Sequence, residues 1–213
     1  MHQPIDIFIT PVPGGVKSWL EAFPKAQMSA DVKLVQLKSG VSNNIHGLIF
    51  WLHMNEDRQD WLTNTIISIK KNYNDAKIIV LANAPNQAEA FYALSLGVVA
   101  YSHAFSPASV LNEIKTVISH GGVWMSQDFL KRLIEVSTSL AGNQTELVNQ
   151  HLSLLTKREK DVAIQAAKGL SNKEIARICK ITERTVKAHL SSTFERLGAK
   201  DRLHLALMLN NKA

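Results

Sequence analysis

Short apolar runs alternate with helical patterns along the first 120 residues of the chain. The runs are rich in β-branched and aromatic residues and too continuously apolar to be half exposed, which is typical of buried parallel strands. They cover residues 5–10, 32–37, 48–53, 77–82 and 98–102. Helices are expected between them over residues 15–23, 58–72, 86–96 and 106–119. This alternation predicts an open α/β fold, a doubly wound five-stranded parallel sheet with helices on both faces.

Local signals mark the start of two of these helices. Asn86 and Glu89 have the spacing of a capping box, and Ser106 precedes a proline, which is favoured at the first helical position. Residues 38–47 are polar and resemble a loop, so the helix expected between the second and third strands is short or missing.

A further helical pattern covers residues 124–140, where Met125, Phe129, Leu133 and Val136 are spaced to share one face. Polar residues follow at 141–153 and predict a flexible joint.

Four helical patterns occupy the last 60 residues. The first two each begin with a hydroxyl residue three positions ahead of a glutamate, Thr156 with Glu159 and Ser171 with Glu174. In such a capping box the two residues satisfy backbone amides that the helix leaves free. The third pattern begins at an N-cap threonine and ends at a glycine. Helices are therefore expected over residues 155–169, 171–181, 182–198 and 200–210, which predicts an all-α domain with a helix-turn-helix.

The third of these helices has two distinct sectors when its residues are placed about 100° apart. The apolar sector contains Val186, Leu190, Thr193, Phe194 and Leu197. The opposite sector contains Arg184, Lys187, Ala188, Ser191 and Glu195. A helix that enters a DNA groove needs a long cation, as at Lys187, and small residues that allow close approach, as at Ala188 and Ser191. An ordinary amphipathic helix with a polar outer face would show the same pattern.

Charge and composition narrow the class of protein. Residues 151–213 hold 13 Lys and Arg against 6 Asp and Glu, a net charge of +7, whereas the preceding residues sum to −1. A basic module beside a near-neutral one is the electrostatic signature of polyanion binding, although a solvated basic face gives the same count. The single cysteine excludes an internal disulfide. No signal peptide or membrane-spanning run is present, so a cytoplasmic protein without a membrane partner is expected.

The C-terminal motifs "LTKRE", "GLSNKEIA", "ITERTVKAHL" and "LGAKDR" resemble the LuxR/FixJ, or NarL-type, helix-turn-helix over nearly its whole length. The resemblance implies that the third helix enters the major groove of double-stranded DNA. It places Lys187, Ala188 and Ser191 at the bases, and Lys173 and the neighbourhood of Thr182 near phosphates. Arg184 lies in the same outer sector and is included in the DNA-binding set. The matching Glu159 and Arg202 are interpreted as structural residues, and His189, which lies between the two sectors, as a hydrogen-bonding residue of the helix surface rather than a base reader.

The N-terminal half resembles a response-regulator receiver but lacks its phosphorylation chemistry. A receiver carries an acidic pair after the first strand that holds Mg²⁺, a phosphorylated aspartate at the end of the third, and a Ser or Thr after the fourth and a Lys after the fifth that meet the phosphoryl oxygens. The corresponding positions here hold, in the same order, Thr10 and Pro11, Leu52 or His53, Ala82, and Ala104. We therefore expect no aspartyl phosphorylation and no metal site.

Nearby residues are poor substitutes for these groups. Glu56, Asp57 and Asp60 lie beyond the third strand and are interpreted as loop and helix-start charges. Asp6 lies at the opposite end of its strand, and His53 is a lone histidine without metal ligands.

A branch of the family with degenerate receivers binds cyclic di-GMP through a W-[F/L/M]-[T/S]-R motif. Trp124, Met125 and Ser126 match its first three positions, and Gln127 stands where the arginine is expected. A glutamine has no charge and fewer donors than a guanidinium. Trp61–Asn64 matches the same three positions at an unrelated place, so the partial match also fits simple packing of Trp124.

The expected organisation is a receiver-like domain over residues 1–121, a linker helix and joint over 122–150, and a LuxR-type DNA-binding domain over 151–213. The expected function is a dimeric, sequence-specific transcriptional regulator that is not an enzyme. Control is expected through oligomerisation or cyclic di-GMP rather than aspartyl phosphorylation, and no other cofactor is expected. The alternative is an interaction protein that opposes another transcription factor.

Overall fold

The computed structural model describes residues 4–35, 47–54, 58–140 and 152–210. Contacts divide the chain into two compact units, residues 1–85 with 93–125 and residues 126–213 with 86–92. The contact boundary after Met125 lies beyond residue 121, where the receiver-like domain was predicted to end. Most of the predicted loop at 38–47 and of the predicted joint at 141–153 falls outside the described residues.

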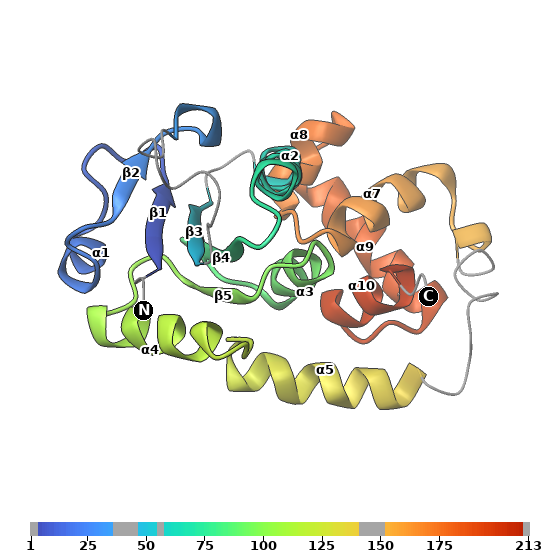
Figure 1. The fold of residues 1–213 in the computed structure, drawn as a ribbon. Coiled ribbons are helices and arrows are strands. Elements are labelled where there is room, and N and C mark those ends of the chain that lie inside the picture. Colours follow the sequence, from blue (N-terminus) through green and yellow to red (C-terminus); the bar gives the residue numbers. More distant parts are fainter. Residues whose placement is uncertain (1–3, 36–46, 55–57, 141–151, 211–213) are drawn as a thin grey trace. The chain divides into compact units, whose positions relative to one another are not determined.

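The first unit contains a five-stranded parallel sheet (Figure 1). Its strands are β1 (Ile5–Ile9), β2 (Gln27–Ser29), β3 (Leu48–His53), β4 (Lys77–Ala82) and β5 (Ala100–His103). They run in the order β2-β1-β3-β4-β5, and every neighbouring pair is parallel. All six residues of β3 are buried, as are five of the six in β4, which explains why their sequences are continuously apolar. The predicted doubly wound parallel sheet is confirmed.

The second strand was predicted at the wrong place. The structure forms β2 from Gln27–Ser29, and residues Val32–Leu34 form a short 3-10 helix, η1. The carboxylate of Asp31 accepts a hydrogen bond from the backbone N of Lys33 at 2.9 Å and thereby caps this turn. All three residues of β2 are only half buried, since β2 is an edge strand, and its sequence lacks the apolar run that marks the central strands.

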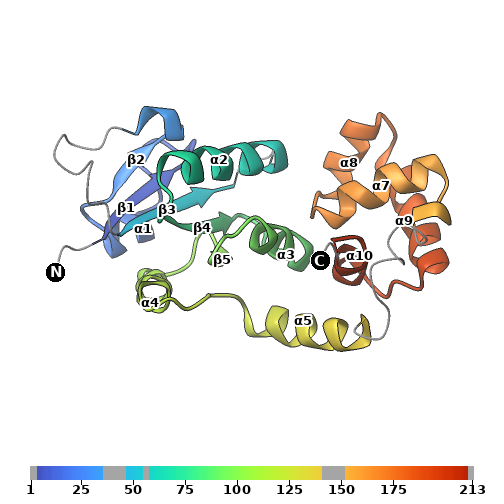
Figure 2. The same ribbon diagram turned by 45° about the vertical axis from the view of Figure 1, so that its right-hand side comes forward.

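Helices α1 (Lys17–Ala22) and α4 (Ala108–Ser119) cover one face of the sheet and contact each other. Helix α2 (Arg58–Asn72) covers the opposite face, as the turned view in Figure 2 shows. Helix α3 (Gln87–Ser95) follows β4 in the chain. The core beneath α1 and α4 is strongly aromatic, and it includes Phe8, Trp19, Phe23 and Trp51 together with Leu111, Ile114 and Ile118 of α4.

Two predicted helix starts need correction. Ser106 does not cap α4, because the N-cap position is Pro107, and the hydroxyl of Ser106 lies 3.2 Å from the hydroxyl of Ser102. The helix expected from Trp124 begins instead at Gln127, because the backbone of Trp124 pairs with β5. At the start of α3, the side chain of Asn86 accepts the predicted hydrogen bond from the backbone N of Glu89 at 2.8 Å.

The second unit is helical, with α5 (Gln127–Leu140), α7 (Lys157–Ala167), α8 (Asn172–Cys179), α9 (Glu183–Leu197) and α10 (Arg202–Asn210). Both predicted capping boxes are formed, at Thr156 with Glu159 and at Ser171 with Glu174. The helices enclose a compact apolar core that includes Val162, Ala166, Ile175, Val186, Leu190 and Leu205. Complete burial of one of the larger aliphatic side chains stabilises a fold by about 1.5–3 kcal/mol, so this core fixes α9 against α7 and α8.

Candidate functional site

Helix α9 presents the predicted polar sector to solvent. Lys187, Ala188 and Ser191 are all exposed, whereas Val186 and Leu190 on the other side are buried. The six residues that sequence reasoning assigned to DNA, Lys173, Thr182, Arg184, Lys187, Ala188 and Ser191, are exposed. The outer face of α9 therefore combines cations with small side chains and leaves room for another backbone to approach closely.

The start of α9 is fixed by local geometry. The hydroxyl of Thr182 accepts a hydrogen bond from the backbone N of Thr185 at 3.2 Å, so Thr182 is the N-cap that its sequence predicted. Just before it, Lys180 ends α8 with a left-handed backbone at φ 53° and ψ 48°. Among the described residues other than glycine, Lys180 alone has a positive φ. This turn sets the angle between α8 and α9, and a β-carbon makes it costly.

Lys173 lies in the first turn of α8, next to Asn172, whose side chain is hydrogen-bonded to Arg202 at the start of α10. The guanidinium of Arg202 donates to the carbonyl oxygen of Leu170 at 2.7 Å and to Oδ1 of Asn172 at 3.3 Å. Burial lowers the pKa of Arg202, yet a guanidinium remains a cation at neutral pH. The structural role of Arg202 is therefore to hold the turn from which Lys173 projects.

The predicted structural role of Glu159 is also explained. Its side chain is buried and accepts hydrogen bonds from both the backbone N and the hydroxyl of Thr156, which lower its pKa. Nε of Arg196, at the end of α9, lies 3.4 Å from its other oxygen. His189 is half buried between the two sectors of α9, and its interpretation as a hydrogen-bonding residue of the helix surface stays a prediction.

The carboxyl edge of the sheet contains a hydrogen-bonded chain of uncharged residues where a receiver has charged ones. The hydroxyl of Thr10 lies 2.9 Å from Nδ1 of His53, and Nε2 of His53 lies 2.8 Å from Oδ1 of Asn83. Because the amide oxygen of Asn83 can only accept, Nε2 donates to it and Nδ1 accepts from the hydroxyl of Thr10. Both ring nitrogens are thus satisfied without a charged partner.

An indole ring closes this edge. Trp19 of α1 is fully buried and meets the ring of His53 edge-on, with centroids 5.1 Å apart. Its Nε1 donates at 2.7 Å to the carbonyl oxygen of Ala104, the residue at the position that corresponds to the lysine of a receiver. Phe8 is stacked between Trp19 and Trp51, at centroid distances of 4.9 and 5.4 Å. Sequence reasoning did not identify Trp19, and its only signal was its place in the helix after the first strand.

The remaining acidic candidates of the first unit have other partners or lie outside the description. Asp6 is buried, accepts from Nε1 of Trp51 at 3.0 Å and pairs with Lys115 of α4 at 2.6 Å. Asp60 is exposed in the first turn of α2, and residues 55–57, which include Glu56 and Asp57, are not described. Over the described part of the chain, no three His, Cys, Asp or Glu side chains come together as metal ligands would.

Residues 124–126 have local structural roles, whereas the side chain of Gln127 is exposed. The backbone of Trp124 bonds to Val99 and Tyr101 beside β5, and its partly buried side chain packs against the aromatic core. Met125 is buried, the hydroxyl of Ser126 accepts from the backbone N of Phe129 at 3.2 Å, and Gln127 is exposed.

The second glycine of the preceding pair is explained by close packing. A Cβ at Gly122 would lie 2.7 Å from Val117 Cγ1. The "GGVWMSQ" segment is therefore accounted for as a turn, a short pairing with β5 and a helix cap.

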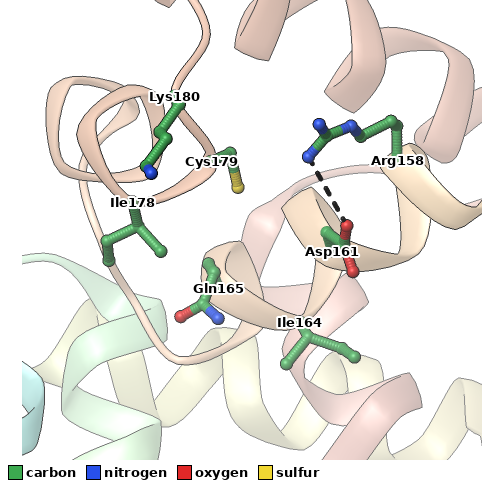
Figure 3. Close-up of a pocket in the computed structure, with 7 residues that line it drawn as sticks. All are labelled: Arg158, Asp161, Ile164, Gln165, Ile178, Cys179 and Lys180. Carbon is green, nitrogen blue, oxygen red and sulfur yellow. Dashed lines mark ion pairs between the residues drawn. The ribbon is translucent and has the colours of Figure 1, made fainter.

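A pocket of about 380 Å³ lies between α7 and the end of α8 (Figure 3). Arg158 and Asp161 on its wall pair with each other at 3.8 Å. Burial raises the pKa of the Cys179 thiol, which disfavours the reactive thiolate. The remaining lining residues are Ile164, Gln165, Ile178 and Lys180. The described lining residues of the pocket thus hold an internal ion pair and a thiol whose burial disfavours the thiolate, and they form no nucleophile–base pair.

No helix in the described ranges has the length and apolar character needed to cross a bilayer.

Comparisons with known proteins agree with this architecture. Residues 153–209 match the family of bacterial regulatory proteins named luxR. The uncharacterized transcriptional regulatory protein YhcZ of Bacillus subtilis is 36% identical over 152 residues, which are 67% of this chain and 65% of that protein. The match thus spans just under two thirds of the length of YhcZ.

Similarity to response regulators extends along most of the chain. The nitrate/nitrite response regulator protein NarP of Escherichia coli is 26% identical over 194 residues, which are 91% of this chain and 87% of NarP. A solved structure of two RcsB dimers bound to two parallel DNAs has a TM-score of 0.52 at 16% identity and covers 100% of both chains, a likeness of fold alone. Residues 153–209 therefore form a LuxR-family domain, and most of the chain, with its parallel sheet and its helix-turn-helix, is similar to response regulators.

Proposed function

We propose that this protein is a sequence-specific transcriptional regulator that binds double-stranded DNA through α9. The observation that carries the proposal is the outer face of α9, where Lys187, Ala188 and Ser191 are exposed together on a helix anchored by a buried core. Lys187 can reach a base edge or a phosphate, while the two small residues let the helix backbone come close to the groove floor. Lys173 and Arg184 add cations on the same domain, and Thr182 begins the helix.

The proposed regulator acts as a homodimer. Helix-turn-helix proteins read two half-sites with two copies, because a single recognition helix covers only a few base pairs. The relatives named as transcriptional regulatory or response regulator proteins support the same class of function.

Control of this regulator does not pass through aspartyl phosphorylation. The edge of the sheet where a receiver takes up phosphate holds Thr10, His53 and Asn83 in a closed hydrogen-bonded chain, covered by Trp19. None of these side chains can form the acyl phosphate that an aspartate forms.

Cyclic di-GMP control is a narrower question, and it depends on Gln127. Trp124, Met125 and Ser126 are engaged in packing and capping, so the geometry favours a structural role for them. Isothermal titration with cyclic di-GMP on the wild type and on Trp124→Ala decides the matter. We expect no heat of binding, and a saturable signal that Trp124→Ala abolishes would establish the ligand.

Selection of bound DNA from a random pool, followed by affinity measurements over a range of salt concentrations, tests the proposed function. A regulator yields an enriched motif and an affinity that falls steeply with salt, because each neutralised phosphate releases counterions. The alternative function, an interaction protein that opposes another regulator, predicts an unenriched pool. That result would overturn the proposal.

A further inference from the structure

The linker helix α5 is tied to the start of α10 by a charged contact. Nε of Arg132 lies 3.1 Å from Oδ2 of Asp201, and its Nη2 donates to the same oxygen. The third nitrogen, Nη1, donates to Glu135 of the same helix at 3.1 Å. Helices α5 and α10 pack against each other along this contact. Arg132 and Asp201 are both partly exposed, so the pair lies near the surface of the unit.

Asp201 is also the residue that begins α10. Its second oxygen, Oδ1, accepts a hydrogen bond from the backbone N of His204 at 2.8 Å, the geometry of an N-cap. The carboxylate of Asp201 thus pairs with Arg132 of α5 and caps α10, and its orientation depends on both interactions. Loss of Arg132 would leave the cap in place but remove the partner that orients the carboxylate toward α5.

Arg202, the residue after Asp201, links the start of α10 to the part of the domain predicted to contact DNA. Arg202 reaches the turn between α7 and α8, where it bonds to Leu170 and Asn172. Asn172 directly precedes Lys173, which is exposed. The start of α10 therefore stands between a contact with α5 on one side and the turn that carries Lys173 on the other.

We propose that Arg132 is a positioning residue for Lys173, which acts through Asp201 and Arg202 to hold the first turn of α8 where its lysine can meet a DNA phosphate. The proposal rests on the proposed function, since it concerns how one phosphate contact is made. Phosphate contacts fix the register of a protein on the duplex, so a displaced Lys173 would weaken binding without altering the bases that are read. Because α5 begins at Gln127, directly after the first unit, Arg132 gives that helix a means to influence DNA affinity.

The direct test is a double-mutant cycle on DNA affinity between Arg132→Gln and Lys173→Gln. The single change Arg132→Gln should lower affinity several-fold and reduce the slope of log K against log salt by about 0.9, the value for one lost phosphate contact. In the Lys173→Gln background, Arg132→Gln should cause little further loss. With Lys187→Gln, whose lysine lies on α9, the two losses should multiply, because distant and independent sites are additive.

A second change separates positioning from simple charge. Asp201→Asn keeps a good N-cap but removes the charge that pairs with Arg132. It makes the protein more positive, so electrostatics alone predicts tighter DNA binding, whereas loss of positioning predicts weaker binding. Arg132→Lys should restore most of the affinity, because an ammonium can still pair with Asp201.

Arg158 and Asp161 supply the matched control, since they form an Arg–Asp pair in the same unit, on the pocket of Figure 3. Whatever change in DNA affinity Arg158→Gln causes in the wild type, it should cause the same fold-change in the Lys173→Gln background. Multiplicative losses for Arg132→Gln with Lys173→Gln would overturn the inference, as would tighter binding by Asp201→Asn.

A measurement without DNA distinguishes failure of the inference from failure of the proposed function. Arg132→Gln should speed hydrogen exchange at the backbone amides of Leu170 and Glu174, which flank the tethered turn, and leave that at Val186 in α9 unchanged. Unchanged exchange at the turn would overturn the positioning link even if DNA binds. A wild-type protein without salt-dependent, selective DNA binding would instead overturn the proposed function and this role with it.

Discussion

Polar side chains at the carboxyl edge of the sheet are hydrogen-bonded to one another, whereas those on the outer face of α9 are exposed to solvent. At the edge, Thr10, His53 and Asn83 satisfy one another, and the ring of Trp19 covers His53. On α9, Lys187 and Ser191 point to solvent. Buried polar groups need partners inside the fold, while exposed ones can exchange water for a ligand.

This difference separates a region that serves the fold from the surface proposed to bind DNA. The five-stranded sheet keeps its topology although the charged groups of a receiver are absent, because the topology depends on buried apolar strands rather than on the residues at their ends. The exposed cations of α9 lie outside the apolar core of their domain, so the packing of that core does not depend on them. Perturbing the first region should therefore change stability, and perturbing the second should change binding.

The largest expected effect is on stability, from Trp19→Ala at the sheet edge. The change removes a fully buried indole, its stacking on Phe8 and its hydrogen bond to Ala104. Large-to-small changes of this kind cost about 3–5 kcal/mol. Urea unfolding followed by circular dichroism measures the loss, and Leu20→Ala, on the same helix but 45% exposed, is the control. Equal losses for both variants would contradict a packed edge.

The next largest effect is on DNA affinity, from Lys187→Ala on α9. If Lys187 reads a base edge, its loss costs about 1–3 kcal/mol of discrimination and relaxes the preference at one position of the site. Thermal unfolding should stay unchanged, because the side chain is exposed. Lys160→Ala, an exposed lysine on α7, is the control for charge. The groove assignment fails if selective, salt-dependent binding survives Lys187→Ala intact.

The sequence predicted those parts of the molecule where local signals and burial agree. The central strands, both capping boxes and the two sectors of α9 follow from apolar runs, from hydroxyl–glutamate spacing and from periodicity. The edge strand β2 was misplaced because its half-buried residues carry no such signal, while Val32 and Leu34 imitate one.

Contacts between distant residues could not be predicted in the same way. The chain from Thr10 to Asn83, the Trp19 ring and the Arg132 contact with Asp201 join residues that lie far apart in the sequence. Their partners depend on how the elements pack, which no local pattern encodes. The polar face of α9, in contrast, lies on one helix and was therefore accessible from periodicity.

A smaller effect is expected at Lys180, which sets the turn before α9. Its left-handed backbone costs a residue with a Cβ about 1–2 kcal/mol, so Lys180→Gly should stabilise the C-terminal unit by up to about that amount. Lys180→Gln removes the same charge and keeps the Cβ, so the difference between the two variants isolates the backbone. Calorimetric unfolding measures it. A glycine variant no more stable than the glutamine variant would show that the turn is unstrained.

The smallest expected effect is none at all, for beryllofluoride or acetyl phosphate with Mg²⁺. A receiver responds to these reagents because an aspartate and an acidic pair hold the phosphoryl group and the metal. Here both nitrogens of His53 are engaged, by Thr10 and by Asn83, and the described side chains of the edge form no cluster of the oxygen ligands that Mg²⁺ prefers. Oligomeric state by light scattering and affinity for the selected DNA should be the same with and without the reagent. His53→Asp should not create a response, because it supplies one carboxylate and leaves Thr10 and Ala104 in place. A shift in either quantity for the wild type would mean that the edge still binds phosphate, and the contrast between a closed edge and an open α9 face would no longer hold.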